Sequence, residues 1–174
     1  MFYKVPDRVF APLAEKEIVK GRVLVVNDPE HDLKTQIQDD GCEVYSCTLD
    51  DLVSEQYAPR IPEIDWMICV TQGLGKKAEW VIDSGLVLPK KGFCLLDRIS
   101  FLEPTRSRQH LLLSDSLRNL IILSPRPAFR ADNKQAKDSV TSAWFVFSPT
   151  HANRNNTEID FALNWHRPKT LCSG

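Results

Sequence analysis

The order of its apolar segments is the feature that most constrains what this chain can fold into. Short β-branched runs alternate with segments of helical periodicity through the first part of the sequence. In chain order, helical and strand-like segments follow one another at residues 10–18, 22–28, 29–40, 42–47, 65–70, 78–85, 92–98 and 105–114. Strands that alternate with helices of this length predict a doubly wound, mainly parallel α/β sheet.

The end of the chain has a different pattern. Residues 119–124, 143–148 and 159–165 are strand-like, but the polar connections between them lack the apolar periodicity of a crossover helix. Consecutive strands without a crossover pair most simply as antiparallel neighbours, so we expect all three to extend the sheet in that way. The length is typical of one domain, and we expect residues 1–174 to form it.

Several classes of protein are disfavoured by simple features of the sequence. The N-terminus lacks a signal peptide, and no window has the apolar length of a membrane span, so we expect a cytoplasmic protein with no membrane partner. The four histidines are far apart, and no serine or cysteine lies in a nucleophile motif, so no catalytic residue is predicted. The cysteines are predicted to be free thiols, the first four of them buried, instead of metal ligands: Cys42, Cys47, Cys69, Cys94 and Cys172.

Charge is distributed unevenly along the chain. Residues 27–65 are strongly acidic, whereas residues 98–137 carry an excess of arginine and lysine. Arg98 stands at the end of a predicted strand, at the edge where doubly wound sheets bind their ligands. A basic region can contact the phosphates of a nucleic acid, although solvated surface charges would give the same pattern. The candidate nucleic-acid-binding residues are Arg98, Arg106, Arg108, Arg126 and Arg130.

Three segments in the second half carry a more specific likeness. They are LLDRISFLEPTRSR at 95–108, IILSPRPAF at 121–129 and SAWFVF at 142–147. In this order they resemble the bacterial and phage family of adenine-N6 DNA methyltransferase-like proteins, with specific similarity from about residue 92 to 165. The resemblance implies a methyltransferase fold, S-adenosylmethionine as cofactor and DNA as substrate.

The cofactor loop of that family departs from its pattern here. After its first strand the family has a motif that resembles D-P-x-x-G-x-G. The glycines let the backbone approach the cofactor closely. This chain keeps Asp28 and Pro29 but has Asp32 and Lys34 at the glycine positions. Two carboxylates about 4 Å apart in a partly buried site repel by up to about 4 kcal/mol. The resemblance also implies an acidic residue for the ribose after the second strand, either Asp50 or Asp51, so the vestigial cofactor residues are Asp28, Pro29, Asp50 and Asp51.

The catalytic loop differs from the family pattern even more than the cofactor loop does. The family has N-P-P-Y/F after a strand that aligns with 65–69, where it holds the flipped base and its exocyclic amine. This chain has Val-Thr-Gln-Gly at 70–73, without the proline pair or the ring, and Gln72 could replace the amide only after a shift of two positions. The turn at 73–77 also fails the phosphate-loop pattern and is interpreted as an ordinary basic turn. Trp144, Phe145, Phe147 and Trp165 could stack on bases, but their alternation favours a core role.

These features predict a catalytically degenerate methyltransferase-like protein that binds no cofactor and no metal. It would act as a binding or accessory factor, with nucleic acid or another protein as partner. Two alternatives stay open: an active S-adenosylmethionine-dependent adenine-N6 DNA methyltransferase, and a structural or assembly protein that reuses the fold.

Overall fold

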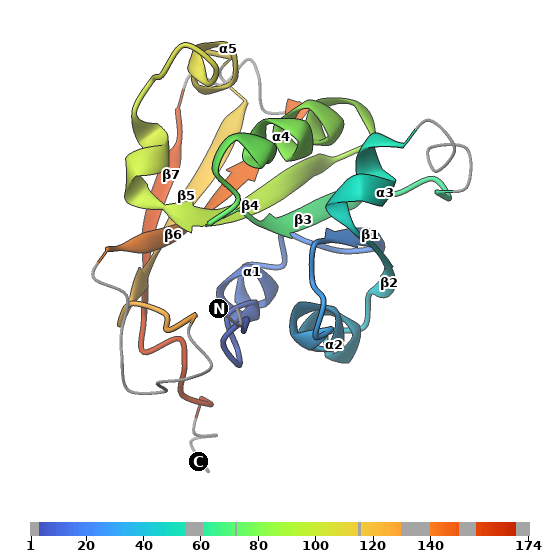
Figure 1. Cartoon of the computed structure of the whole chain (residues 1–174). Coiled ribbons are helices and arrows are strands. Elements are labelled where there is room, and N and C mark those ends of the chain that lie inside the picture. Colours follow the sequence, from blue (N-terminus) through green and yellow to red (C-terminus); the bar gives the residue numbers. More distant parts are fainter. Residues whose placement is uncertain are drawn as a thin grey trace.

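The computed structural model describes residues 4–54, 61–71, 73–114, 116–129, 140–149 and 156–169. It is built on a seven-stranded sheet of order β2-β1-β3-β4-β6-β5-β7, with helices on both faces (Figure 1). The strands are β1 Arg22–Val26, β2 Glu43–Cys47, β3 Trp66–Val70, β4 Gly92–Arg98, β5 Leu117–Ser124, β6 Ser142–Phe147 and β7 Glu158–Leu163. The predicted fold class and all seven predicted strands are confirmed.

Strand directions follow the prediction except at the end of the chain. β1 to β4 run parallel to one another, and β6 lies between β4 and β5 and is antiparallel to both. The expectation that the last strand is also antiparallel to its neighbour is wrong, because β7 pairs in parallel with β5. β7 lies beyond β5 at the edge of the sheet, and both strands run antiparallel to β6.

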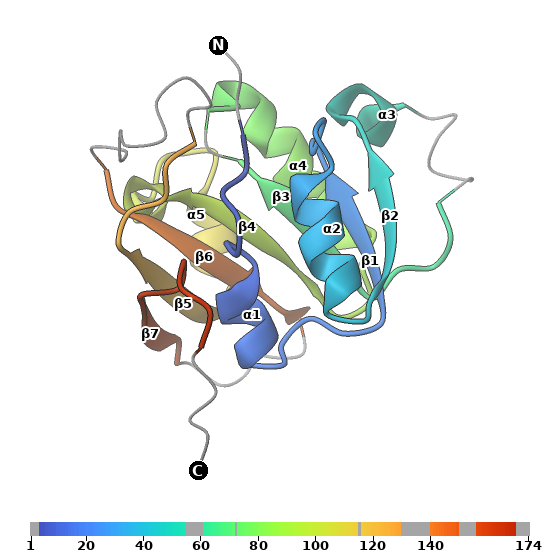
Figure 2. The same cartoon turned by 90° about the horizontal axis from the view of Figure 1, so that it is seen from below.

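Helices cover both faces of the sheet (Figures 1 and 2). Apolar residues of α1 (Ala11–Glu15) and α2 (Asp32–Asp39) pack in one core, and those of α3 (Leu49–Val53), α4 (Ala78–Val87) and α5 (Gln109–Leu112) pack in the other. α3 was not predicted, and α5 is much shorter than the predicted 105–114. The helices that pack on the two faces make the sheet doubly wound, and its carboxyl edge is left for loops.

The cysteines and aromatic residues belong to the core. Cys42, Cys47, Cys69 and Cys94 are free and buried, as predicted, while Cys172 lies outside the described residues. Burial raises the pKa of the Cys47 thiol to about 12, so this group stays protonated at neutral pH. Trp144, Phe145, Phe147 and Trp165 are all buried, which favours the core role over a base-stacking platform.

Two further findings concern sites that the described residues do not contain. No cluster of three or more His, Cys, Asp or Glu side chains that could hold a metal ion occurs in the described ranges. None of the helices in those ranges has the length and apolar character that crossing a membrane requires.

Candidate functional site at the carboxyl edge of β3 and β4

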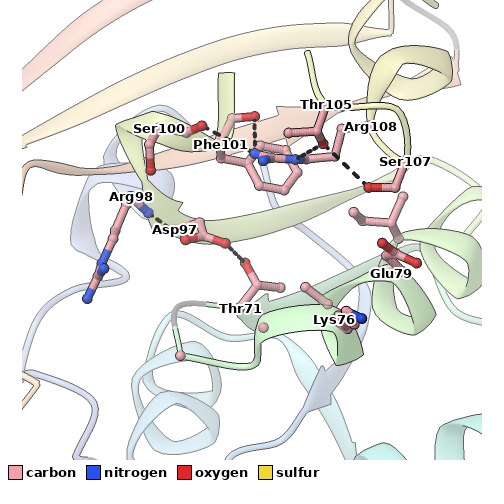
Figure 3. A pocket seen from close by; sticks show the side chains of 14 residues that line it. Thr71, Lys76, Glu79, Asp97, Arg98, Ser100, Phe101, Thr105, Ser107 and Arg108 are labelled. Carbon is pink, nitrogen blue, oxygen red and sulfur yellow. Dashed lines mark hydrogen bonds between the residues drawn. The ribbon is translucent and has the colours of Figure 1, made fainter. Parts of the chain in front are cut away.

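A cavity of about 510 Å³ opens where β3 and β4 end (Figure 3). Its walls come from the loop after β3, the start of α4, the 3₁₀ helix Ile99–Leu102 and the turn before α5. This is the edge at which doubly wound sheets bind ligands. The wall residues with polar side chains are Thr71, Lys76, Glu79, Asp97, Arg98, Ser100, Thr105, Ser107 and Arg108.

Asp97 links the ends of the two strands that form the cavity. Its Oδ2 accepts a hydrogen bond from Thr71 Oγ1 at 2.8 Å, and its Oδ1 accepts one from the Arg98 backbone N–H at 2.7 Å (Figure 3). Burial raises the pKa of Asp97, while these hydrogen bonds and the charges of Arg108 and Arg98 oppose the shift. The cavity therefore contains a positioned carboxyl group that the sequence analysis did not identify.

Arg108 is held rigidly on the cavity wall. Its Nε donates to Thr105 Oγ1 at 3.0 Å, and its Nη1 donates to the carbonyl oxygens of Phe101 at 2.7 Å and Ser100 at 3.2 Å. The guanidinium also lies 5.1 Å from the centre of the Phe101 ring, within cation–π distance. Phe101 is buried and its ring centre lies 5.0 Å from that of Phe145, so it offers no free face for a base to stack on.

The predicted arginines are only partly brought together. Arg98 and Arg108 line the same cavity, and Arg98 is exposed, with no hydrogen bond or ion pair from its side chain to a described residue. Arg106 is exposed in the same turn as Arg108 but is not part of the cavity wall. Arg126 follows β5, whose carboxyl end lies at the same edge as that of β4. Arg130 lies outside the described residues.

Lys76 and Glu79 are cavity residues that sequence reasoning passed over. Lys76 lies in the 3₁₀ helix Gly75–Lys77, and Glu79 lies in the first turn of α4. Gly73 and Gly75 have φ angles of 88° and 58°, so the chain turns sharply there and brings Lys76 to the wall. The glycine-rich turn at 73–77 was the available signal, because such turns at strand ends often bind anions even without the phosphate-loop pattern.

The loop after β1 and the start of α2 contain two carboxylates, those of Asp28 and Asp32. Asp28 is buried, and its Oδ2 accepts a hydrogen bond from the Lys34 backbone N–H at 2.8 Å, which fixes the first turn of α2. Burial raises the pKa of Asp32, and the charge of Asp28 adds to the shift, while Lys4 opposes it. Pro29 is exposed. The charge of Asp28 thus acts on Asp32 in the direction expected from the sequence.

The two acids after β2 have different roles. Asp51 completes a capping box: its Oδ2 accepts from Thr48 N at 3.2 Å and Thr48 Oγ1 at 2.8 Å, and its N–H donates to Thr48 Oγ1 at 3.1 Å. Asp50 is exposed. Of this pair, only Asp50 has a carboxylate that helix capping does not use. None of the vestigial cofactor residues Asp28, Pro29, Asp50 and Asp51 is among the described wall residues of the cavity.

Comparison with solved structures gives the class of the fold. A protein from Listeria monocytogenes assigned to the class I S-adenosylmethionine-dependent methyltransferases superposes with a TM-score of 0.58 and 12% identity, over 95% of this chain and 67% of that one. The chain has a methyltransferase-like fold. A protein from Agrobacterium tumefaciens assigned as an O-methyltransferase matches with a TM-score of 0.40 and 12% identity, over 82% of this chain and 78% of its own. No protein-family model and no curated protein sequence matches the chain.

Proposed function

We propose that this protein is a methyltransferase-like binding protein that contacts nucleic-acid phosphates through the cavity at the ends of β3 and β4 and transfers no methyl group. The observation that carries the proposal is the composition of the cavity wall. Three cations, Lys76, Arg98 and Arg108, line it together with the carboxylates of Asp97 and Glu79. Its one described aromatic ring, that of Phe101, is already covered by Arg108. Such a wall suits an anion better than a stacked base.

The three cations differ in how far their side chains are already ordered for binding a phosphate. Arg108 is fixed by three hydrogen bonds inside the chain, so its Nη2 donors are presented without further ordering. Arg98 and Lys76 are exposed, and charges of this kind add sequence-independent affinity for a phosphate chain. The hydroxyls of Ser100, Thr105 and Ser107 lie on the same wall and can donate to phosphate oxygens as well.

Loss of methyl transfer is supported by the two loops that would carry it. Asp28 accepts a hydrogen bond from the Lys34 backbone N–H in α2, and Asp32 stands where the family that the chain resembles has glycine. In the loop after β3, the Thr71 hydroxyl donates a hydrogen bond to Asp97, and Gly73 has no side chain. Gln72, which lies between them, is outside the described residues. The resemblance to adenine-N6 DNA methyltransferase-like proteins remains the reason to propose DNA as the nucleic acid.

Neutralising the two exposed cavity cations is expected to weaken nucleic-acid binding in a salt-dependent way. A plot of log affinity against log salt concentration has a negative slope. For the double variant Arg98→Gln, Lys76→Gln, this slope should become shallower by about 2, or about 1 for each cation that no longer neutralises a phosphate. Fluorescence anisotropy with labelled single strands and duplexes measures this slope. Arg108 is left unchanged because it also holds the cavity wall.

A matched control removes a charge from the opposite edge of the sheet. Lys90 precedes β4 and forms an exposed ion pair with Glu63, so Lys90→Gln changes the net charge but should leave the slope almost unchanged. Equal slopes for the wild type and the double variant would show that the cavity does not contact phosphate.

An active methyltransferase is the second candidate, and Asp97 is the observation that favours it. A partly buried carboxyl group with a raised pKa, at the substrate-binding edge of a methyltransferase-like fold, is suited to accept a proton from a substrate. Asp50 is exposed and does not cap a helix, so it is the candidate to bind a ribose in this enzyme. This candidate requires S-adenosylmethionine binding, whereas the proposed binding protein does not.

We expect S-adenosylmethionine not to stabilise the protein. At a hundred times its dissociation constant a true ligand adds about 2.7 kcal/mol, which for a chain of this size raises the melting temperature by about 5–10 °C. Thermal unfolding with and without the cofactor measures the shift. Saturable binding in calorimetry that Asp50→Ala abolishes would establish the active enzyme instead. Asp51→Ala is a poor probe, because it also removes a helix cap that contributes about 1 kcal/mol.

A further inference from the structure

The strand at one edge of the sheet, β7, exposes a row of three apolar side chains. Ile159, Phe161 and Leu163 are 59%, 64% and 68% exposed. In the parallel ladder with β5 they are paired with Leu120, Ile122 and Ser124, so they continue the apolar face of β5 toward the edge. Large apolar residues in a row on an edge strand are unusual, because such strands are normally protected from pairing.

The backbone of β7 is open along its outer edge. β7 pairs with β5 on one side, and no described residue pairs with its other side (Figure 2). The Asn164 N–H donates to the Ser124 carbonyl at 2.7 Å, so the even-numbered residues of this segment direct their backbone groups toward β5. The N–H and C=O groups of Ile159, Phe161 and Leu163 therefore point outward.

Described strand β7 itself lacks the sequence features that usually protect an edge strand. β7 contains no proline and no lysine, and its pairing with β5 shows no bulge. Its two acidic residues, Glu158 and Asp160, lie on the opposite face, where Lys16 of the segment after α1 contacts both, at 3.1 and 2.8 Å. Their charge is thus partly balanced within the chain and does not repel a strand that approaches the edge.

We propose that β7 pairs antiparallel with β7 of a second copy, about a two-fold axis at Phe161. In this register Phe161 faces its own counterpart and Ile159 faces Leu163, so the exposed apolar row meets an apolar row. The same three positions have the outward backbone groups, so each becomes a hydrogen-bonded pair of the new ladder. The two sheets would join into one continuous sheet.

The charges on the other face fit the same register. Asp160 would lie opposite Ala162, and Glu158 opposite Asn164, so no acidic residue faces another. One two-fold register thus satisfies the apolar row, the outward backbone groups and the charges of β7. The strand is therefore complementary to a second copy of itself. This favours a second copy over a strand of another protein. Because the contact is one short strand and its side chains, we expect a weak dimer with micromolar affinity.

Sedimentation equilibrium of the full chain over a range of concentrations tests the proposal. The wild type should show a reversible monomer–dimer equilibrium. Phe161→Lys places two like charges opposite each other on the axis and should raise the dissociation constant at least about tenfold. Val87→Lys, at another strongly exposed apolar residue in α4, should leave the dimer intact. Both side chains are exposed, so the melting temperature of the monomer should change little.

Oxidative crosslinking tests the register. In a Cys172→Ser background, Phe161→Cys should form a disulfide-linked dimer, because directly opposed residues of a hydrogen-bonded pair lie about 5.5 Å apart at Cα. Leu163→Cys should not crosslink to itself, because its partner position is Ile159. A wild type that is monomeric at every concentration, or a dimer that survives Phe161→Lys, would overturn the proposal. Stronger crosslinking at Leu163 than at Phe161 would do the same.

Discussion

Replacing Gly92 by alanine is expected to destabilise the fold by about 3 kcal/mol or more. Gly92 begins β4 with a φ of 153°, an angle that side-chain-bearing residues rarely adopt. A Cβ at this position would overlap the backbone carbonyl oxygen of Phe147 and would lie 3.0 Å from the Trp66 ring. Because Phe147 belongs to β6, the neighbouring strand in the middle of the sheet, the obstacle cannot move without breaking the ladder.

Chemical denaturation of the variant and the wild type measures this loss. Gly41→Ala is the matched control, because Gly41 also has a positive φ, 88°, but a Cβ there would meet no atom within 4 Å. The free energy of unfolding of this control should fall by only about 1–2 kcal/mol, which is the cost of a positive φ angle for alanine. If Gly92→Ala were no less stable than Gly41→Ala, the close approach of β4 to β6 would not limit this position.

The strands could be predicted because burial on both faces leaves a clear mark in the sequence. Residues 23–26, 66–70 and 92–96 are buried throughout, so each is a continuous apolar run without alternation. The direction of the last strand could not be predicted in the same way. Apolar periodicity identifies a segment but not its neighbour, and β7 pairs with β5 instead of the preceding β6.

The missed helix had a signal that was available in the sequence. Thr48 and Asp51 have the spacing of a capping box, and this motif starts α3. The family resemblance instead assigns one of the two acids of this segment, Asp50 or Asp51, to a ribose. The predicted helix at 105–114 was too long because only Leu111 of α5 packs fully in the core, so little holds a longer helix against the sheet.

The sequence predicts where the candidate site lies but not which residues line it together. Arg98 at the end of a parallel strand already indicated the right edge of the sheet. The contact of Thr71 with Asp97 joins residues 26 positions apart, and it depends on the register of β3 with β4. Arg106 and Arg108 are close in sequence, yet the turn before α5 places only Arg108 on the cavity wall.

Trp144→Ala is expected to be the other severely destabilising substitution, with a loss of about 3–5 kcal/mol. Trp144 lies in the segment at 142–147 that carries part of the family resemblance, and its side chain has no exposed surface. Its Nε1 donates to the Val9 carbonyl at 2.8 Å, which ties β6 to the segment before α1. Alanine would leave a large void and an unpaired buried carbonyl group.

Trp144→Phe separates the core role from a base-stacking role. Phenylalanine keeps most of the apolar volume and an aromatic face but loses the hydrogen bond to Val9, so we expect a loss of about 1–3 kcal/mol. Denaturation measures the stability, and anisotropy of the folded variant measures nucleic-acid affinity. Trp144 packs in the core with α1 and α2, whereas the cavity residues Ile82 and Phe101 pack in the other core. Affinity should therefore stay unchanged, and a variant of wild-type stability with weakened binding would mean that Trp144 contacts the bases directly.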